Sequence, residues 1–365
     1  MWPSCFVFAT CQPGMEAALK RELARKAPLL RPAFLRPGFV TLKAPEPVAL
    51  DARFEAVFAR AAGVSVLRVA PGKGASTEAL AAATSQALQE LGASMPELPR
   101  ALRLHVFERE AHVPGEEPLG FVVGAQAGIA EEVLLAADAE TRFLDGSRAE
   151  PGETVLDVIV VEPDVWWLGA HTHNEWHSPH PGGRPPCVMP AEAPSRAYRK
   201  LHEALEWSAL PLRPGDTAVE LGSAPGGASY GLLERGLRVV GIDPAAMDPR
   251  VVAHPDFVHI QVPVHRVPRE DLPEQIEWLL LDINLGPEIA LTQVGRLSRR
   301  MERSLCGVLL TLKLNEPRFA DDVPAMLEML WDMGFSDVRA AQLPSHRREL
   351  AAMALTPRGR ARLGR

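Results

Sequence analysis

The chain has 365 residues, and its 46 acidic residues outnumber the 39 basic ones, which gives a net charge of −7. Its 47% hydrophobic and 23% charged residues are typical of a globular protein and exclude wholesale disorder. The chain contains no run of about 18 apolar residues, so we expect no membrane-spanning helix. Its length predicts two or three domains.

The cysteines and histidines favour neither a metal site nor a disulfide framework. Cys5, Cys11, Cys187 and Cys306 are scattered and form no C-x-x-C pair, which is typical of a protein of the reducing cytoplasm. His171 and His173 lack further ligands at metal spacing, so we expect no bound metal.

The first half of the chain is predicted to be an α+β region built from two small subdomains, because short apolar runs alternate with helical patterns. The predicted strands cover residues 5–10, 38–42, 102–108, 155–161 and 165–168, and the predicted helices cover residues 15–26 and 76–91. We expect Trp166 and Trp167 to pack in its core. Residues 20–43 carry seven basic side chains against one acid, Glu22, which indicates either a phosphate-binding face or a solvated helix face.

A proline-rich segment, residues 175–194, interrupts every helix and strand pattern and is interpreted as a linker. Beyond it, strands and helices alternate regularly, which predicts a doubly wound α/β sheet. The predicted strands cover residues 217–222, 238–243, 257–262, 278–282, 307–313, 338–343 and 350–355, and the predicted helices cover residues 196–208, 227–235, 287–304 and 322–333.

Lysine is scarce in this chain. Of the 39 basic residues 33 are arginine, and after Lys73 the only lysines in the sequence are Lys200 and Lys313. Arginine stays protonated, whereas a lysine can lose its proton when its pKa is lowered. Either the two lysines survive by chance, or they occupy positions where a guanidinium cannot act.

The most specific local motif is the segment VELGSAPGGASY, residues 219–230. A strand here ends in a glycine turn that enters a helix, and glycines let a backbone approach a ligand closely. The segment is neither G-x-G-x-x-G nor a P-loop. The next predicted strand ends in Asp243, where a carboxylate can accept hydrogen bonds from a ribose diol. Together these features favour a cofactor that contains adenosine.

Four more charged residues lie at the ends of predicted elements: Lys200, Asp282, Lys313 and Glu349. Each alone is typical of a solvated strand or helix end. Because ligands of such sheets bind outside the carboxyl ends of the strands, the four together indicate a site. A lysine next to a second cation has a lowered pKa and can act as a general base.

These motifs resemble the FtsJ-like ribose 2′-O-methyltransferases, which carry a Lys-Asp-Lys-Glu tetrad. The stretch from SPHPGGRP to PSRAYRKLHEA is similar to the THUMP-bearing members that methylate a cytidine of bacterial 23S rRNA, and FATCQPGME is similar to their ferredoxin-like start. The resemblance implies a Rossmann-like class I methyltransferase domain over residues 195–365, a ferredoxin-like subdomain over 1–60 and a THUMP-like RNA-binding subdomain over 61–174.

The resemblance also implies S-adenosylmethionine as cofactor and 23S rRNA, before the ribosome is fully assembled, as partner of a monomer. Lys200, Asp282, Lys313 and Glu349 would then be catalytic, with Lys313 as general base and Lys200 lowering its pKa. The implied cofactor contacts are Ser195, Gly222, Ala224, Pro225, Gly226, Gly227, Asp243 and Asp282. The sequence departs from the family pattern at Pro263, where an acidic residue is usual, and at Ala224, where a cysteine is common.

Three alternatives remain open at this point. The chain could methylate tRNA or another rRNA nucleotide, it could be an inactive methyltransferase-like factor that binds RNA, or it could be a nicotinamide-dependent oxidoreductase. The lack of G-x-G-x-x-G disfavours the oxidoreductase. The complete tetrad disfavours the inactive factor.

Overall fold

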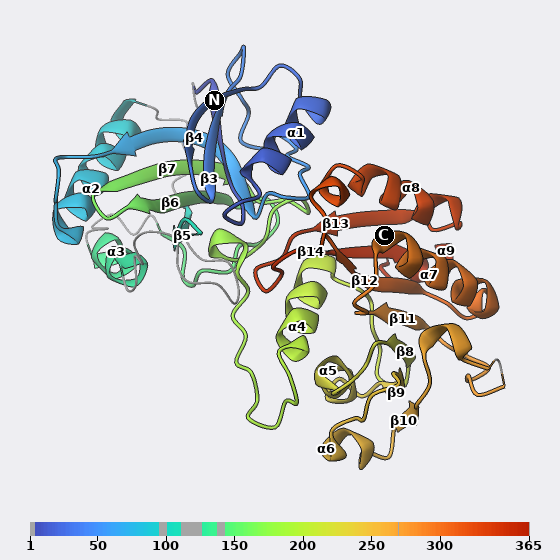
Figure 1. The fold of residues 1–365 in the computed structure, drawn as a ribbon. Coiled ribbons are helices and arrows are strands. Elements are labelled where there is room, and N and C mark those ends of the chain that lie inside the picture. The colour runs from blue at the N-terminus through green and yellow to red at the C-terminus, as the bar shows by residue number, and fades with distance from the viewer. Residues whose placement is uncertain (1–3, 95–100, 111–125, 137–142, 269, 365) are drawn as a thin grey trace. The chain divides into compact units, whose positions relative to one another are not determined.

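The computed structural model describes residues 4–94, 101–110, 126–136, 143–268 and 270–364 (Figure 1). The chain divides into two compact units, Met1–Pro185 and Pro186–Arg365. The boundary lies within the proline-rich segment. Residues before it pack in the first unit, because Gly182 lies against the ring of Phe107.

The first unit contains a seven-stranded sheet in the order β2-β3-β1-β4-β7-β6-β5. Its strands are β1 (Phe6–Thr10), β2 (Arg31–Arg36), β3 (Phe39–Lys43), β4 (Ala61–Val69), β5 (Arg103–Glu108), β6 (Thr154–Glu162) and β7 (Val165–Thr172). Its helices are α1 (Glu16–Lys26), α2 (Thr77–Ser94), α3 (Gln126–Ala136) and the short 3₁₀ helix η1 (Pro181–Gly183). Neighbouring strands are antiparallel except β5 and β6. Strands β1 and β4 pair directly, so the two predicted subdomains share one sheet.

The two tryptophans of β7 confirm the prediction that they lie in the core, since Trp166 is 0% and Trp167 is 9% exposed. Successive side chains of a strand point to opposite faces of the sheet. Trp166 therefore packs with Leu80 of α2 and Leu134 of α3, whereas Trp167 packs with Phe8 and Phe39 on the other face.

Strands β2 and β4 and helix α3 were not predicted from the sequence. β2 contains Pro32, which cannot donate to a strand ladder and is tolerated because β2 is an edge strand. β4 begins with Ala-Ala-Gly, residues of low strand propensity. Its pairing with β1 and β7 therefore comes from the sheet and not from local preference.

The second unit contains a seven-stranded sheet in the order β10-β9-β8-β11-β12-β14-β13, which confirms the predicted doubly wound α/β sheet (Figure 1). Its strands are β8 (Thr217–Leu221), β9 (Arg238–Ile242), β10 (Phe257–Ile260), β11 (Trp278–Leu281), β12 (Gly307–Lys313), β13 (Asp337–Ala341) and β14 (Glu349–Leu355). Its helices are α4 (Ala197–Ser208), α5 (Gly227–Leu233), α6 (Pro249–Val252), α7 (Pro287–Met301), α8 (Val323–Asp332), α9 (Pro357–Ala361) and the 3₁₀ helices η2 (Val264–Arg266) and η3 (Pro317–Ala320).

The central strands of this sheet are almost wholly apolar and buried, as the WLLL of β11 and the GVLLTLK of β12 show. Such runs are typical of parallel strands that helices cover on both faces. β8 pairs with β9 on one side and with β11 on the other, so the strand order reverses at β8. Ligands of doubly wound sheets bind outside the carboxyl ends of the strands at such a reversal. Within the described residues no helix is both long and apolar enough to cross a membrane.

Two histidines of the first unit, the buried His173 and the partly buried His177, predict a loss of stability in mild acid. Burial and the neighbouring His171 lower the pKa of His173 to about 4 and that of His177 to about 2. Below pH 6.5 these histidines bind protons in the unfolded chain but remain neutral in the folded unit. The free energy of unfolding should therefore fall as the pH falls from 6.5 towards 4, by about 1 kcal/mol per pH unit for each histidine.

Urea unfolding between pH 7 and pH 4.5 tests this expectation. The double variant His173→Asn and His177→Asn should show a flatter pH dependence than the parent chain. His265→Asn, which changes an exposed histidine of the second unit, is the matched control. Equal slopes in all three proteins would show that these two histidines do not cause the acid sensitivity.

Candidate active site

The structure brings the four predicted tetrad residues together at one edge of the second sheet. Asp282 directly follows β11, and Lys313 is the last residue of β12. β12 and β14 are antiparallel, and their register places Lys313 opposite Glu349. β11 pairs with β12, so its end reaches the same edge. Lys200 comes from the first turn of α4.

The four side chains form a closed ring of alternating charge. Lys313 Nζ lies 2.6 Å from Asp282 Oδ1 and 2.6 Å from Glu349 Oε2. Lys200 Nζ lies 3.5 Å from Asp282 Oδ2 and contacts Glu349 Oε1. Each carboxylate thus bridges both ammonium groups, and each ammonium group contacts both carboxylates. The side chains of Lys313 and Glu349 are 13% and 10% exposed.

The electrostatics of this ring correct one prediction. We expected Lys200 to lower the pKa of Lys313. Burial does act to lower the pKa of Lys313, but its attraction to Asp282 and Glu349 outweighs burial, and the pKa is raised. Burial conversely acts to raise the pKa of Glu349, and the two lysines outweigh it, so that pKa is lowered. Both groups are therefore held in their charged forms.

The turn between β8 and α5 lies beside the ring. Gly222 has a φ of +81°, and a Cβ there would overlap the backbone carbonyl of Asp282. Gly226 has a φ of +112°, a conformation that side-chain-bearing residues rarely adopt. A Cβ on Gly227 would overlap the hydroxyl of Ser195. The glycines thus let the turn pass close to both β11 and the start of α4.

Asp243 bonds to this turn, and Ser195 lies against it. Asp243 Oδ2 accepts a hydrogen bond of 3.2 Å from the backbone N–H of Ala224, and Oδ1 accepts one of 2.8 Å from Ala245. Helix α4 begins at Ala197, and the Ser195 hydroxyl accepts a hydrogen bond from the Ala197 N–H at 3.3 Å. Both predicted cofactor residues therefore face the same turn.

Two buried acids were given no role by the sequence analysis. Glu220 lies in β8, and burial raises its pKa to about 8, so it is protonated at neutral pH. Its partner is the hydroxyl of Ser229 in α5. Glu203 lies in α4, one turn after Lys200, and bonds to Ser345. The only local signal for Glu220 is its place in the VELG motif, and Glu203 looks like an ordinary helix acid.

The three residues before Glu349 differ in their exposure to solvent. Arg347 and Arg348 are exposed. His346 is 1% exposed, and its Nδ1 accepts a hydrogen bond from Leu343 N–H at 3.2 Å. His346 therefore closes a turn and does not face solvent. Pro263, the departure from the family pattern, lies just before η2 and offers no carboxylate.

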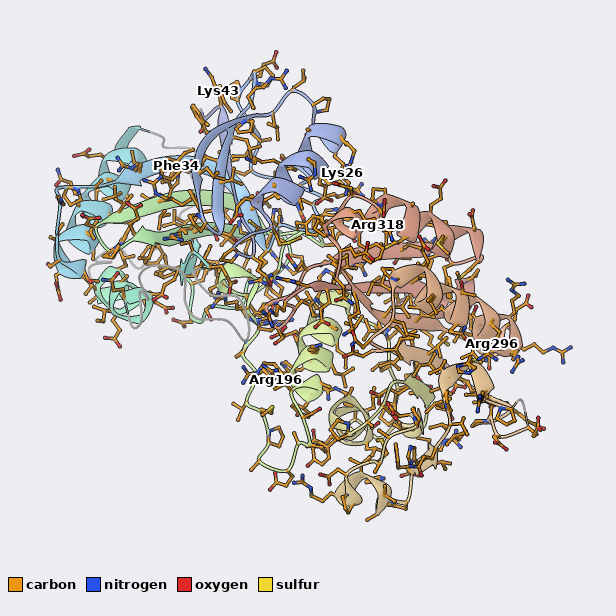
Figure 2. All side chains as sticks on the ribbon, viewed as in Figure 1. Lys26, Phe34, Lys43, Arg196, Arg296 and Arg318 are labelled. Carbon is orange, nitrogen blue, oxygen red and sulfur yellow. The ribbon has the colours of Figure 1, made fainter. Side chains whose placement is uncertain are left out.

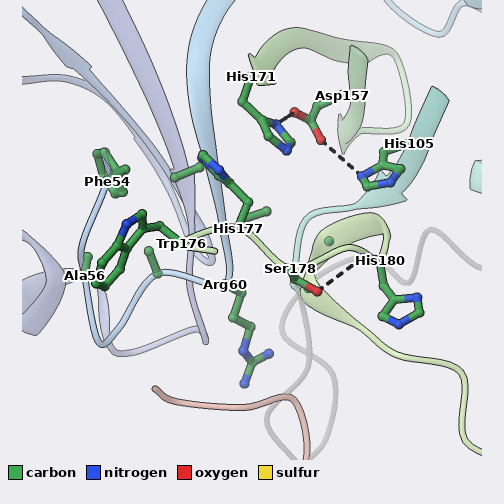
Figure 3. Close-up of a pocket in the computed structure, with 15 residues that line it drawn as sticks. Phe54, Ala56, Arg60, His105, Asp157, His171, Trp176, His177, Ser178 and His180 are labelled. Atoms are coloured by element: carbon green, nitrogen blue, oxygen red, sulfur yellow. Dashed lines mark hydrogen bonds and ion pairs between the residues drawn. The ribbon is translucent and has the colours of Figure 1, made fainter. Parts of the chain in front are cut away.

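A separate pocket is lined by residues of the first unit alone (Figure 3). His171 Nδ1 lies 2.8 Å from Asp157 Oδ2, and the ring of His177 stacks on that of His171 at 4.2 Å. No group of three or more metal-ligating side chains with suitable geometry occurs in the described ranges. The pocket thus contains none of the predicted site residues.

Comparisons with known proteins point to a methyltransferase family. Residues 193–314 match the model of the FtsJ-like methyltransferase family, a stretch that includes Lys200, Asp282 and Lys313. Three similar curated proteins all bear the name Ribosomal RNA large subunit methyltransferase M. The protein of Laribacter hongkongensis (strain HLHK9) is 34% identical over 155 residues, which cover 41% of this chain and 39% of that protein.

The protein of Alkalilimnicola ehrlichii is 33% identical over 189 residues, covering 49% of this chain and 50% of that protein. The protein of Sodalis glossinidius is 28% identical over 235 residues, covering 60% of this chain and 62% of that protein. The chain thus spans about half the length of the curated relatives it matches. The family match and the ring at the end of the sheet agree: this chain contains an FtsJ-like methyltransferase domain.

Proposed function

We propose that the chain transfers a methyl group from S-adenosylmethionine to the ribose 2′-hydroxyl of a cytidine in 23S rRNA. The observation that carries the proposal is the closed Lys200-Asp282-Lys313-Glu349 ring beside the glycine turn. The names of the relatives support an rRNA of the large subunit as substrate. The choice of cytidine rests on the resemblance of the segment around Lys200 alone.

The residues of the β8–α5 turn fit an adenosine-containing cofactor. Asp243 presents a carboxylate whose two oxygens are oriented by backbone N–H groups, as suits a ribose diol. Gly226 and Gly227 leave the turn without side chains where a ligand must approach. S-adenosylmethionine supplies a methyl group that is already activated by a positively charged sulfur. Ser195, Gly222, Ala224, Pro225, Gly226, Gly227, Asp243 and Asp282 are the residues proposed to hold it.

The ring residues would then orient the ribose and accept the proton of its 2′-hydroxyl. Lys313 Nζ would accept the proton of the 2′-hydroxyl as that oxygen forms its new bond, and Lys200 would stabilise the developing negative charge. Because both carboxylates raise the pKa of Lys313, the lysine can act as a base only after its ammonium group has released a proton to solvent. Asp282 and Glu349 fix both ammonium groups in place.

The basic cluster of residues 20–43 is proposed to bind the RNA backbone. Lys43 and Lys26 lie on β3 and α1 with exposed side chains (Figure 2). Lys26 is paired with Glu22, and Arg36 is paired with Glu162, so these two contribute less free positive charge than the sequence suggested. Arg31 and Lys43 are exposed at the edge of the sheet.

The proposed base predicts the effect of Lys313→Arg. A guanidinium keeps both carboxylate contacts but cannot give up its proton, so methyl transfer should fall at least about a hundredfold. The assay follows labelled methyl groups into 23S rRNA and maps the product nucleoside by mass spectrometry. The control Lys73→Arg changes an exposed lysine of the first unit. Activity above a few per cent of the parent in Lys313→Arg would refute the assignment of the base.

The glycine turn predicts the effect of Gly227→Ala. The added Cβ would displace the Ser195 hydroxyl, so affinity for S-adenosylmethionine should fall at least about tenfold in isothermal titration. Gly286→Ala is the matched control, because a Cβ there meets nothing within 4 Å. Unchanged affinity in a folded Gly227→Ala protein would place the cofactor elsewhere, and no binding by the parent chain would favour an inactive RNA-binding factor.

The basic cluster predicts the salt dependence of RNA binding. Replacing Lys20, Arg31 and Lys43 by glutamine should reduce the slope of log affinity against log salt by about 2, since each lost phosphate contact removes about 0.7–0.9. Replacing Arg299, Arg300 and Arg303 of the second unit by glutamine gives a control of equal charge. Filter binding that shows the same change in both triple variants would argue against a specific role for the cluster.

A further inference from the structure

We infer that Glu203 is a positioning residue that holds Lys200 in the ring by fastening α4 to the turn before β14. The inference rests on the proposed function for its consequence in catalysis, but not for the contact itself. Glu203 is 5% exposed and makes two hydrogen bonds to one residue. Its Oε2 accepts from the backbone N–H of Ser345 at 2.8 Å, and its Oε1 accepts from the Ser345 hydroxyl at 2.7 Å.

The turn that contains Ser345 immediately precedes Glu349, a member of the ring. Leu343 and His346 close it from both directions, since the His346 N–H donates to the Leu343 carbonyl at 3.0 Å and the Leu343 N–H donates to His346 Nδ1 at 3.2 Å. Three residues after His346 comes Glu349. The Leu314 N–H donates to the Arg348 carbonyl at 2.6 Å, which joins this turn to the end of β12. The turn is therefore continuous with the segment that carries Glu349 into the ring.

Lys200 depends on the Glu203–Ser345 contact more than the other ring members do. Asp282, Lys313 and Glu349 are placed by the register of β11, β12 and β14. Lys200 is placed by a helix, through a long side chain with several rotatable bonds. Residues three apart lie on the same face of a helix, so Glu203 anchors the face from which Lys200 projects. The Lys200–Glu349 pair and the Glu203–Ser345 pair then join α4 at two points to the segment that runs from Ser345 to Glu349.

A carboxylate suits this position better than its amide. Ser345 presents two donors, its N–H and its hydroxyl, and a carboxylate can accept both because it carries two acceptor oxygens. Glutamine has one acceptor oxygen and an NH₂ group that would oppose the Ser345 N–H or hydroxyl. Glu203→Gln should therefore weaken the hydrogen bonds to Ser345 while it preserves the size of the side chain.

The scarcity of lysine gives a direct readout of Lys200. The chain has six lysines, so lysine labelled with ¹³C at the ε-carbon gives few NMR signals, and Lys200→Arg identifies the signal of Lys200. In Glu203→Gln we expect the Lys200 signal to shift. We expect kcat to fall about tenfold to a hundredfold, with KM for S-adenosylmethionine within twofold of the parent.

Two further variants separate positioning from folding. Ser345→Ala removes the hydroxyl but keeps the N–H, so its effects should be smaller and in the same direction. Combined with Glu203→Ala it should add little to the loss from Glu203→Ala alone, because both act through one contact. Glu206→Gln, an exposed glutamate on the same helix, is the matched control and should leave the Lys200 signal and kcat unchanged.

The NMR result decides the inference even if methyl transfer is absent. A Lys200 signal that stays unchanged in folded Glu203→Gln and Ser345→Ala would overturn it. Equal values of kcat in Glu203→Gln and Glu206→Gln would overturn it as well. If the parent chain transfers no methyl group but the Lys200 signal moves as expected, the proposed function fails and the positioning role of Glu203 stands. If Glu203→Ala does not fold, Glu203→Gln and Ser345→Ala carry the test.

Discussion

Four charged groups share one largely buried ring, and the pairing between them is the constraint on which the candidate site depends. An isolated ammonium group or carboxylate at this depth would be costly to desolvate. Here each charge meets two of opposite sign, and two lysines balance two acids. Removing one member would leave its neighbours with unequal charge, so the four positions are coupled in both stability and chemistry.

The sheet explains why the ring lies next to the glycine turn. β8 and β11 are neighbours with Leu221 opposite Leu281, so Gly222 and Asp282 leave the sheet side by side. The Asp282 N–H donates to the Leu221 carbonyl at 2.9 Å, and this is where Gly222 must lack a side chain. Asp282 thereby belongs to both the ring and the turn. A ligand held by the turn and a ribose held by the ring would meet at this residue.

The strands of the second unit could be predicted from the sequence, and so could Asp282 and Lys313, because each of these two charges ends a short apolar run, WLLL or GVLLTLK. Lys200 and Glu349 lie at the start of a helix and of a strand, and only their combination with the other two charges indicated a site. It could not predict the Glu203–Ser345 contact, whose partners lie 142 residues apart. It also missed β4, whose strand character depends on its neighbours in the sheet. A prediction from residue types alone also gave the wrong direction for the pKa of Lys313, since it weighed the second lysine and not the two carboxylates between them.

The raised pKa of Lys313 limits when this residue can act as a base. With only its own four charges, the ring favours the protonated form of Lys313, which cannot act as a base. A further positive charge placed beside Asp282 would share that carboxylate and reduce its hold on Lys313, which would lower the pKa of the lysine. A positively charged methyl donor would meet this requirement. The pKa of Lys313 would then depend, through the carboxylates, on the charge of the ligand that the glycine turn binds. Lys200 would contribute by neutralising the charge of Glu349.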